Sequence, residues 1–180
     1  MKKITLILIL IVVLLGFRWL HSPFIIHHSS KKEGNMKITS VFAHNENIPS
    51  EYTCDGKDLA PVLIISDVPS NTQELVLIVD DPDAPMGTFV HWLLYNLPAN
   101  TIKIDNKKLP AVAKQGFSDF GRIGWGGPCP PSGTHRYFFK LYAIDKKLDL
   151  PIGATKPDLE KATSGHVIEK TELIGVYKRK

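Results

Sequence analysis

The sequence predicts an all-β domain, a sandwich of two antiparallel sheets with one short helix near the C-terminal end. From Met36 onward, short apolar runs are separated by turns rich in Pro, Gly, Asn and Asp, a pattern typical of strands and turns. The run Leu75–Val79 is apolar at every position, which indicates a strand covered on both faces. Signals for a helix start and stop occur together in only one C-terminal segment. A chain of 180 residues has room for one such domain and a short appendage.

The expected strands are the apolar runs that lie between turn residues. They are Lys37–Phe42, Val62–Ile65, Leu75–Asp80, His91–Leu97 and Arg136–Ile144. Side chains alternate between the two faces of a strand. In the fourth run, this alternation places His91, Leu93 and Tyr95 on one face. It places Trp92, Leu94 and Asn96 on the other.

The one expected helix follows Thr155, which is a good capping residue. Pro157 suits the first helical turn, and Asp158 adds a carboxylate near the helix N-terminus. Gly165 supplies the stop. The helix is therefore short and C-terminal.

The first 20 residues differ from the rest of the chain. Two lysines precede the almost unbroken apolar run Ile4–Phe17, which predicts a secretory signal peptide. No small-residue cleavage site and no lipid-accepting cysteine follows, so a membrane anchor formed by residues 4–20 is the alternative. Residues 21–35 then read as a polar linker and residues 36–180 as the domain. The expected location is the periplasm or the extracellular space.

The net charge of +4 comes from 22 basic and 18 acidic residues, and the basic residues gather near the ends of the chain. They include Lys2, Lys3, Lys31, Lys32 and the C-terminal Lys178, Arg179 and Lys180. Charge placed in this way is typical of solvated tails, so no nucleic-acid-binding face is expected.

Cys54 and Cys129 are the two cysteines of the chain. An oxidising compartment permits a disulfide between them, whereas two free buried thiols would be the ordinary alternative. Because an export signal precedes the domain, we expect the disulfide.

The loop Asp81–Pro85 follows the most hydrophobic strand directly. Its two prolines fix the chain path, so the loop holds the carboxylates of Asp81 and Asp83 at a sheet edge. His91 opens the next strand after a short loop, and the hairpin therefore brings an imidazole near these carboxylates.

The stretch from Gly124 to Tyr137 is rich in Gly and Pro. Glycine lets a backbone approach a ligand closely, and its N–H groups suit an anion. His135 and Tyr137 lie two residues apart at the start of a strand, so their side chains share a face. Arg136 points the other way and is expected to pair with a carboxylate there.

Together these segments resemble the signatures of the phosphatidylethanolamine-binding protein family, and in particular its bacterial Raf kinase inhibitor-like branch. The resemblance rests on Asp81–Pro85, His91–Trp92, Gly127–Pro131 and His135–Tyr137, and it extends over Lys37–Tyr177. It implies a two-sheet sandwich with a surface pocket for phosphate-like anions and a cis bond before Pro85. The ligand-binding residues expected from it and from the loop analysis are Asp81, Asp83, His91, Gly126, Gly127, Pro128, His135 and Tyr137.

The expected function is that of a non-enzymatic binding protein for a phosphorylated small molecule, a lipid head group or a phosphopeptide. The resemblance also raises a kinase- or protease-inhibitor role with an unidentified protein partner. Two alternatives use the same aspartates and histidines: a hydrolase with His91 or His135 as base, and a metal-binding protein. No nucleophile in a suitable motif and no closed metal-ligand set is visible, so neither a catalytic residue nor a cofactor is expected.

Overall fold

The computed structural model describes residues 35–179. The predicted targeting segment at residues 1–20 and nearly all of the linker at residues 21–35 lie outside this range. Within residues 35–179, no helix is long and apolar enough to cross a membrane.

The described chain consists of strands, one α-helix and one 3-10 turn. The strands are β1 (Lys37–Thr39), β2 (Glu46–Asn47), β3 (Leu63–Ser66), β4 (Glu74–Asp81), β5 (Phe89–Pro98), β6 (Lys103–Ile104), β7 (Lys114–Gln115), β8 (Phe117–Ser118), β9 (Arg122–Ile123), β10 (His135–Ile144) and β11 (Val167–Tyr177); the helix α2 spans Lys156–Thr163 and the 3-10 turn Ser50–Tyr52. Each of the five predicted strands is present.

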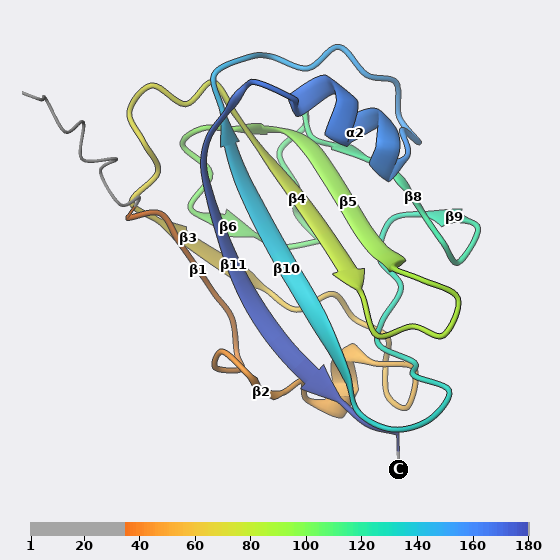
Figure 1. Ribbon diagram of the computed structural model, residues 1–180. Coiled ribbons are helices and arrows are strands. Elements are labelled where there is room, and N and C mark those ends of the chain that lie inside the picture. Colours follow the sequence, from red (N-terminus) through yellow and green to blue (C-terminus); the bar gives the residue numbers. More distant parts are fainter. Residues whose placement is uncertain (1–34, 180) are drawn as a thin grey trace, which may run out of the picture. The chain divides into compact units, whose positions relative to one another are not determined.

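The strands form two main sheets. A six-stranded sheet has the order β2-β11-β10-β4-β5-β7, and a three-stranded sheet has the order β1-β3-β6. The long strands β4, β5, β10 and β11 lie side by side, with β1, β3 and β6 behind them and α2 in front (Figure 1). Pairing is antiparallel except between β11 and β2. This confirms the predicted sandwich with a short C-terminal helix.

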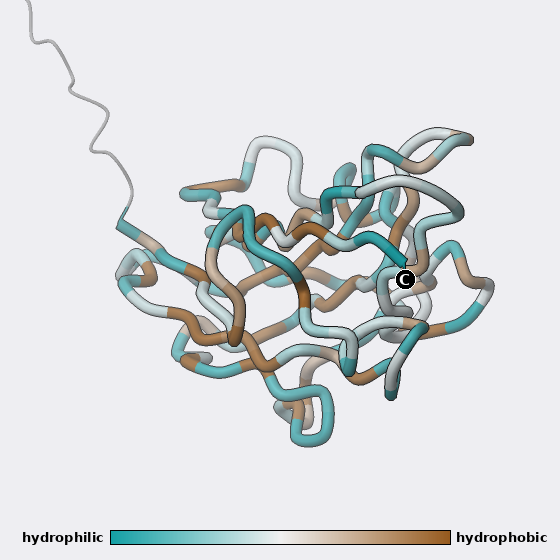
Figure 2. Tube along the Cα trace, turned by 90° about the horizontal axis from the view of Figure 1, so that it is seen from below, coloured by the Kyte–Doolittle hydropathy of each residue, from teal (hydrophilic) through white to brown (hydrophobic). Residues whose placement is uncertain are grey.

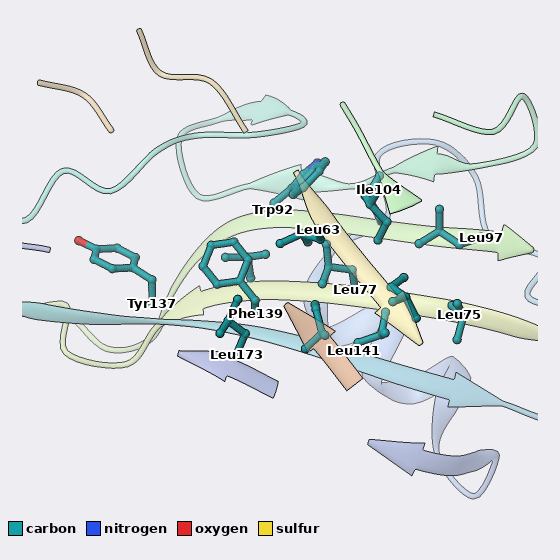
Figure 3. Packing of buried hydrophobic residues seen from close by; sticks show 14 of the residues in the cluster. Leu63, Leu75, Leu77, Trp92, Leu97, Ile104, Tyr137, Phe139, Leu141 and Leu173 are labelled. Carbon is teal, nitrogen blue, oxygen red and sulfur yellow. The ribbon is translucent and has the colours of Figure 1, made fainter. Parts of the chain in front are cut away.

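Both faces of the large sheet are covered, and for this reason β4 is buried at every position. The side chains between the two sheets form one hydrophobic cluster, which includes Leu63, Leu77, Trp92, Phe139 and Leu141 (Figure 3). A second cluster on the opposite face packs under α2 and includes Val76, Leu93, Tyr95 and Leu159. Figure 2 shows the hydrophobic segments mainly in the interior strands, with hydrophilic residues in the loops around them.

Strand β5 departs from simple alternation at two places. Val79 pairs with Trp92 but Asp80 pairs with Val90, so His91 is an extra residue without a Cα partner. Such a β-bulge redirects a side chain. His91 packs edge-on against Tyr137, which belongs to the cluster between the sheets. The prediction that His91 shares a face with Leu93 and Tyr95 is therefore wrong.

A second irregularity lies near the other end of β5. Leu75 pairs with Leu97 and Leu77 with Leu94, so Tyr95 and Asn96 together face Val76. Asn96 has a φ of 55°, in the left-handed region that Asn tolerates better than most residues. Leu97 consequently replaces Asn96 on the face of Trp92 and Leu94, which corrects the second half of the alternation.

Helix α2 begins and ends where the sequence predicts. The carboxylate of Asp158 accepts a hydrogen bond from the backbone N–H of Thr155 at 2.9 Å, as in a capping box. Gly165 has a φ of 78° just after the helix, a conformation that glycine adopts at no steric cost. The helix buries Leu159 against the second cluster and thus covers the outer face of β4 and β5.

Candidate functional site

A pocket of about 560 Å³ opens where β4 ends and β5 begins. Its walls come from the β4–β5 loop, the turn between β8 and β9, and the segment before β10, which lie on one side of the domain (Figure 1). The lining residues are Asp81, Ala84, Pro85, Met86, Gly87, Thr88, Phe89, His91, Asp119, Phe120, Cys129, Pro130, Pro131 and Tyr137. Three of the eight sequence-predicted ligand residues are among them: Asp81, His91 and Tyr137.

Asp81 and His135 form a buried ion-pairing contact beside the pocket. His135 Nδ1 lies 2.7 Å from Asp81 Oδ2, and both side chains are less than a tenth exposed. The other carboxylate oxygen of Asp81 accepts the backbone N–H of Asp83 at 2.8 Å. His135 does not line the pocket itself, so it acts on the pocket through Asp81.

His91 is fixed in the pocket wall by one hydrogen bond. Its Nδ1 lies 2.7 Å from the carbonyl oxygen of Gly126. The ring is enclosed by the aromatic rings of Phe89, Phe120 and Tyr137, with centroids 5.1–5.3 Å away. Burial lowers the pKa of His91 below its ordinary value of 6.5, and the Gly126 carbonyl only partly opposes this effect. The imidazole is therefore neutral at neutral pH.

Tyr137 stands at the end of the inter-sheet cluster, with its hydroxyl directed away from the neighbouring leucines (Figure 3). The hydroxyl is buried, with the backbone N–H of Cys129 near its oxygen, and its own hydrogen has no acceptor among residues 35–179. Burial and the nearby carboxylates of Asp81 and Asp83 raise the pKa of Tyr137 far above its ordinary value. The phenol keeps its proton and remains available as a donor.

The turn between β8 and β9 forms a wall that the sequence did not predict. Asp119 Oδ2 accepts the backbone N–H of Val90 at 2.7 Å and so ties this turn to the start of β5. Phe120 packs against Phe89 and lies directly over Gly126, where an added Cβ would collide with the Phe120 ring. Neither residue belongs to a recognisable motif; only the aromatic residues flanking Asp119 hint at a packed turn.

The glycine-rich segment supports the pocket from behind. The backbone N–H of Gly126 donates to the carbonyl of His91 at 3.0 Å, and that of Gly127 donates to Asp58 Oδ1 at 2.7 Å. The carbonyl of Pro128 accepts from Cys54. Internal partners occupy the two amides and none of the three residues lines the pocket, so a role of these backbone groups in anion binding stays a prediction.

Asp83 also lies outside the pocket lining. Its carboxylate is paired with Arg136 through two side-chain hydrogen bonds of 2.7 and 2.9 Å, which lower the pKa of Asp83 to about 2. The carboxylate pairing expected for Arg136 is thus present, and a ligand-binding role of Asp83 stays a prediction. The bond before Pro85 is trans, not cis, since residues 35–179 contain no cis peptide bond. A turn closed by Gly87 N–H and the Ala84 carbonyl reverses the chain without the cis form, which costs more even for proline.

Cys54 and Cys129 are joined by a disulfide, with their Cα atoms 5.4 Å apart. The bridge connects the segment after the 3-10 turn to the pocket wall at Cys129. It therefore anchors the wall segment that continues into the lining residues Pro130 and Pro131. Among the described residues, no three His, Cys, Asp or Glu side chains gather as a metal-binding group.

The fold and the pocket define a β-sandwich protein. Its pocket lies at one end of the large sheet and is lined by buried Asp, His and Tyr side chains. A family model described as phosphatidylethanolamine-binding protein matches residues 38–178. The chain belongs to the phosphatidylethanolamine-binding protein family.

Curated relatives and solved structures agree with this assignment. A UPF0098 protein of Pyrococcus horikoshii is 50% identical over 154 residues, covering 81% of this chain and 78% of the relative. One of Aquifex aeolicus is 50% identical over 145 residues, covering 77% and 85%. The crystal structure of a phosphatidylethanolamine-binding protein homologue from Chlamydia trachomatis is similar with a TM-score of 0.78 and 39% identity, over 82% of this chain and all of that one. The crystal structure of E. coli YbcL, described as a new member of the mammalian family, is similar with a TM-score of 0.75 and 30% identity, over 81% of this chain and 99% of that one.

Proposed function

We propose that this protein is a non-enzymatic binding protein whose pocket holds the phosphate group of a small molecule or lipid head group. The observation that carries the proposal is the Tyr137 hydroxyl, which is buried near Asp81 and has no acceptor for its hydrogen among the described residues. A buried hydroxyl that lacks a partner costs about 1–3 kcal/mol. A ligand oxygen that accepts a hydrogen bond from this hydroxyl recovers this free energy.

The shape of the pocket supports the same proposal. Much of its lining is apolar, with Ala84, Pro85, Met86, Pro130 and Pro131, and three polar lining side chains, those of Asp81, His91 and Tyr137, are buried. A few placed polar groups inside an apolar enclosure are typical of small-ligand sites. Such a site orients the polar end of a ligand and leaves the rest of it near the rim.

The lining offers little support for covalent catalysis. The sulfur of Cys129 is bonded to Cys54 and so is not a nucleophile. Thr88 contributes an alcohol, but no hydrogen bond joins it to His91 within residues 35–179. An activated nucleophile requires a base within hydrogen-bonding reach. Phosphoesterase turnover that is lost in Asp81→Asn while phosphate still binds would overturn the non-enzymatic assignment.

The binding proposal is tested with Tyr137→Phe, which removes only the hydroxyl. Loss of one donor to an anion should weaken the affinity for inorganic phosphate about tenfold, measured by isothermal titration calorimetry. The free energy of unfolding should stay equal or rise, because the unpaired hydroxyl is gone. Tyr142→Phe is the matched control, since Tyr142 lies on the other face of β10 near Lys170. Equal affinities for the two variants, or no phosphate binding by the wild type, would contradict the proposal.

A further inference from the structure

The proton on the His91 ring is fixed by its surroundings. A carbonyl oxygen only accepts hydrogen bonds, so the contact with Gly126 places a hydrogen on His91 Nδ1. In a neutral imidazole, the other nitrogen then carries a lone pair and accepts. Nε2 makes no hydrogen bond with any described residue, and His91 lines the pocket. The pocket wall therefore presents an acceptor at this point.

The charges that face His91 come from several elements. Asp80 and Asp81 at the end of β4 and Asp119 in the β8–β9 turn favour a protonated imidazole, but burial outweighs them and lowers the pKa of His91. Tyr137, from β10, is a neutral neighbour. The ring is thus an acceptor over the neutral pH range.

The pocket contains no permanent cation among its described lining residues. Two carboxylates line it, Asp81 and Asp119, and no Lys or Arg does. A doubly charged anion would enter this surrounding without a formal positive charge in the lining to balance it. A singly charged anion that also carries a hydrogen is favoured, because it can donate to His91 and accept from Tyr137.

We propose that the pocket selects phosphate groups in their protonated, singly charged form, with the P–OH hydrogen donated to His91 Nε2 and a phosphoryl oxygen accepting from Tyr137. This inference rests on the proposed function and specifies its ligand chemistry. It distinguishes phosphate monoesters from sulfate esters of the same shape. A sulfate ester carries one negative charge and no hydrogen at neutral pH, so the lone pair of His91 opposes it.

The test compares phenyl phosphate with phenyl sulfate on the wild-type protein. The comparison is made at about pH 6.5, where the lowered pKa keeps His91 largely neutral and part of the phenyl phosphate is still the monoanion, since phosphomonoesters lose their second proton near pH 6. Titration calorimetry should show phenyl phosphate binding at least tenfold more tightly. Its affinity should fall as the pH rises to 8, more steeply than that of phenyl sulfate. The sulfate arm corrects for any change of charge in the protein itself.

A variant sharpens the result. His91→Phe removes the acceptor and should reduce the preference for phenyl phosphate to less than about threefold, while Tyr142→Phe, which lies outside the pocket, should retain it. Equal affinities of the wild type for the two ligands at pH 6.5 would overturn the selectivity inference and leave phosphate binding intact. Binding of neither ligand would overturn the proposed function as well.

Discussion

Asp80 and Asp81 are consecutive residues of β4 that serve opposite faces of the sheet. Asp80 is fully buried under α2, with Lys140 and Lys156 each 2.7 Å from its carboxylate. Asp81 is almost as buried, but its partners are one histidine and one backbone amide. The carboxylate of Asp80 therefore fastens helix α2 to the sheet, whereas the carboxylate of Asp81 lies at the pocket.

The largest effect on stability is expected from Asp80→Asn. It leaves Lys140 and Lys156 partly buried without their shared carboxylate, which should lower the free energy of unfolding by about 3 kcal/mol. Urea denaturation measures this change. Phosphate affinity should change much less than stability, because Asp80 lies on the other face and acts on His91 only through its charge. Asp145→Asn, which breaks an exposed pair with His166, is the control and should cost less than about 1 kcal/mol. Similar losses of unfolding free energy in both variants would show that the buried Asp80 pairs contribute no more to stability than an exposed pair does.

His135→Ala makes the corresponding change on the pocket side. It leaves the buried carboxylate of Asp81 without its 2.7 Å partner, so an uncompensated negative charge lies beside the anion. A loss of about 1.5–3 kcal/mol corresponds to at least a tenfold weaker phosphate affinity by calorimetry. Lys156→Ala should leave the affinity unchanged, because Asp80 keeps Lys140. Equal phosphate affinities of His135→Ala and Lys156→Ala would contradict the separate roles of Asp81 at the pocket and Asp80 at the helix.

The smallest expected effect is the pH dependence of stability from His91. Its pKa is lower in the folded protein than the ordinary 6.5, so the unfolded chain binds the proton more readily. The free energy of unfolding should therefore decline as the pH falls below about 6.5, until the folded-state pKa is reached. His91→Phe should reduce this slope, measured by denaturation between pH 7.5 and 4.5, whereas Lys156→Ala should not. An unchanged slope in His91→Phe would assign the acid sensitivity to other groups.

The sequence predicts much of the frame of this comparison. The run Leu75–Val79 identifies the doubly covered strand, and the spacing of His135 and Tyr137 correctly places both on one face, with Arg136 opposite. The proline-rich loop and the helix cap are local signals that tertiary structure does not override. Local chemistry was sufficient in these cases because each feature depends on neighbouring residues.

Features that depend on distant pairing were missed. The bulge at His91 arises from its register with β4, which strand periodicity cannot reveal. The amides of Gly126 and Gly127 looked free in sequence, but their partners are His91 and Asp58, far away in the chain. Strand β11 was not predicted, although its β-branched residues were a usable signal; its partly exposed side chains give a weak alternation.

The extra residue at His91 also bears on how this pocket can evolve. Without it, the alternation of β5 would tie the residue facing the ligand to those that fill the second cluster, such as Leu93 and Tyr95. With the extra residue, the side chain at position 91 does not have to follow the alternating core pattern that begins at Trp92. Mutation can therefore exchange the ligand-facing side chain while the strand pairing that follows is preserved, so new specificities can be sampled on an unchanged scaffold.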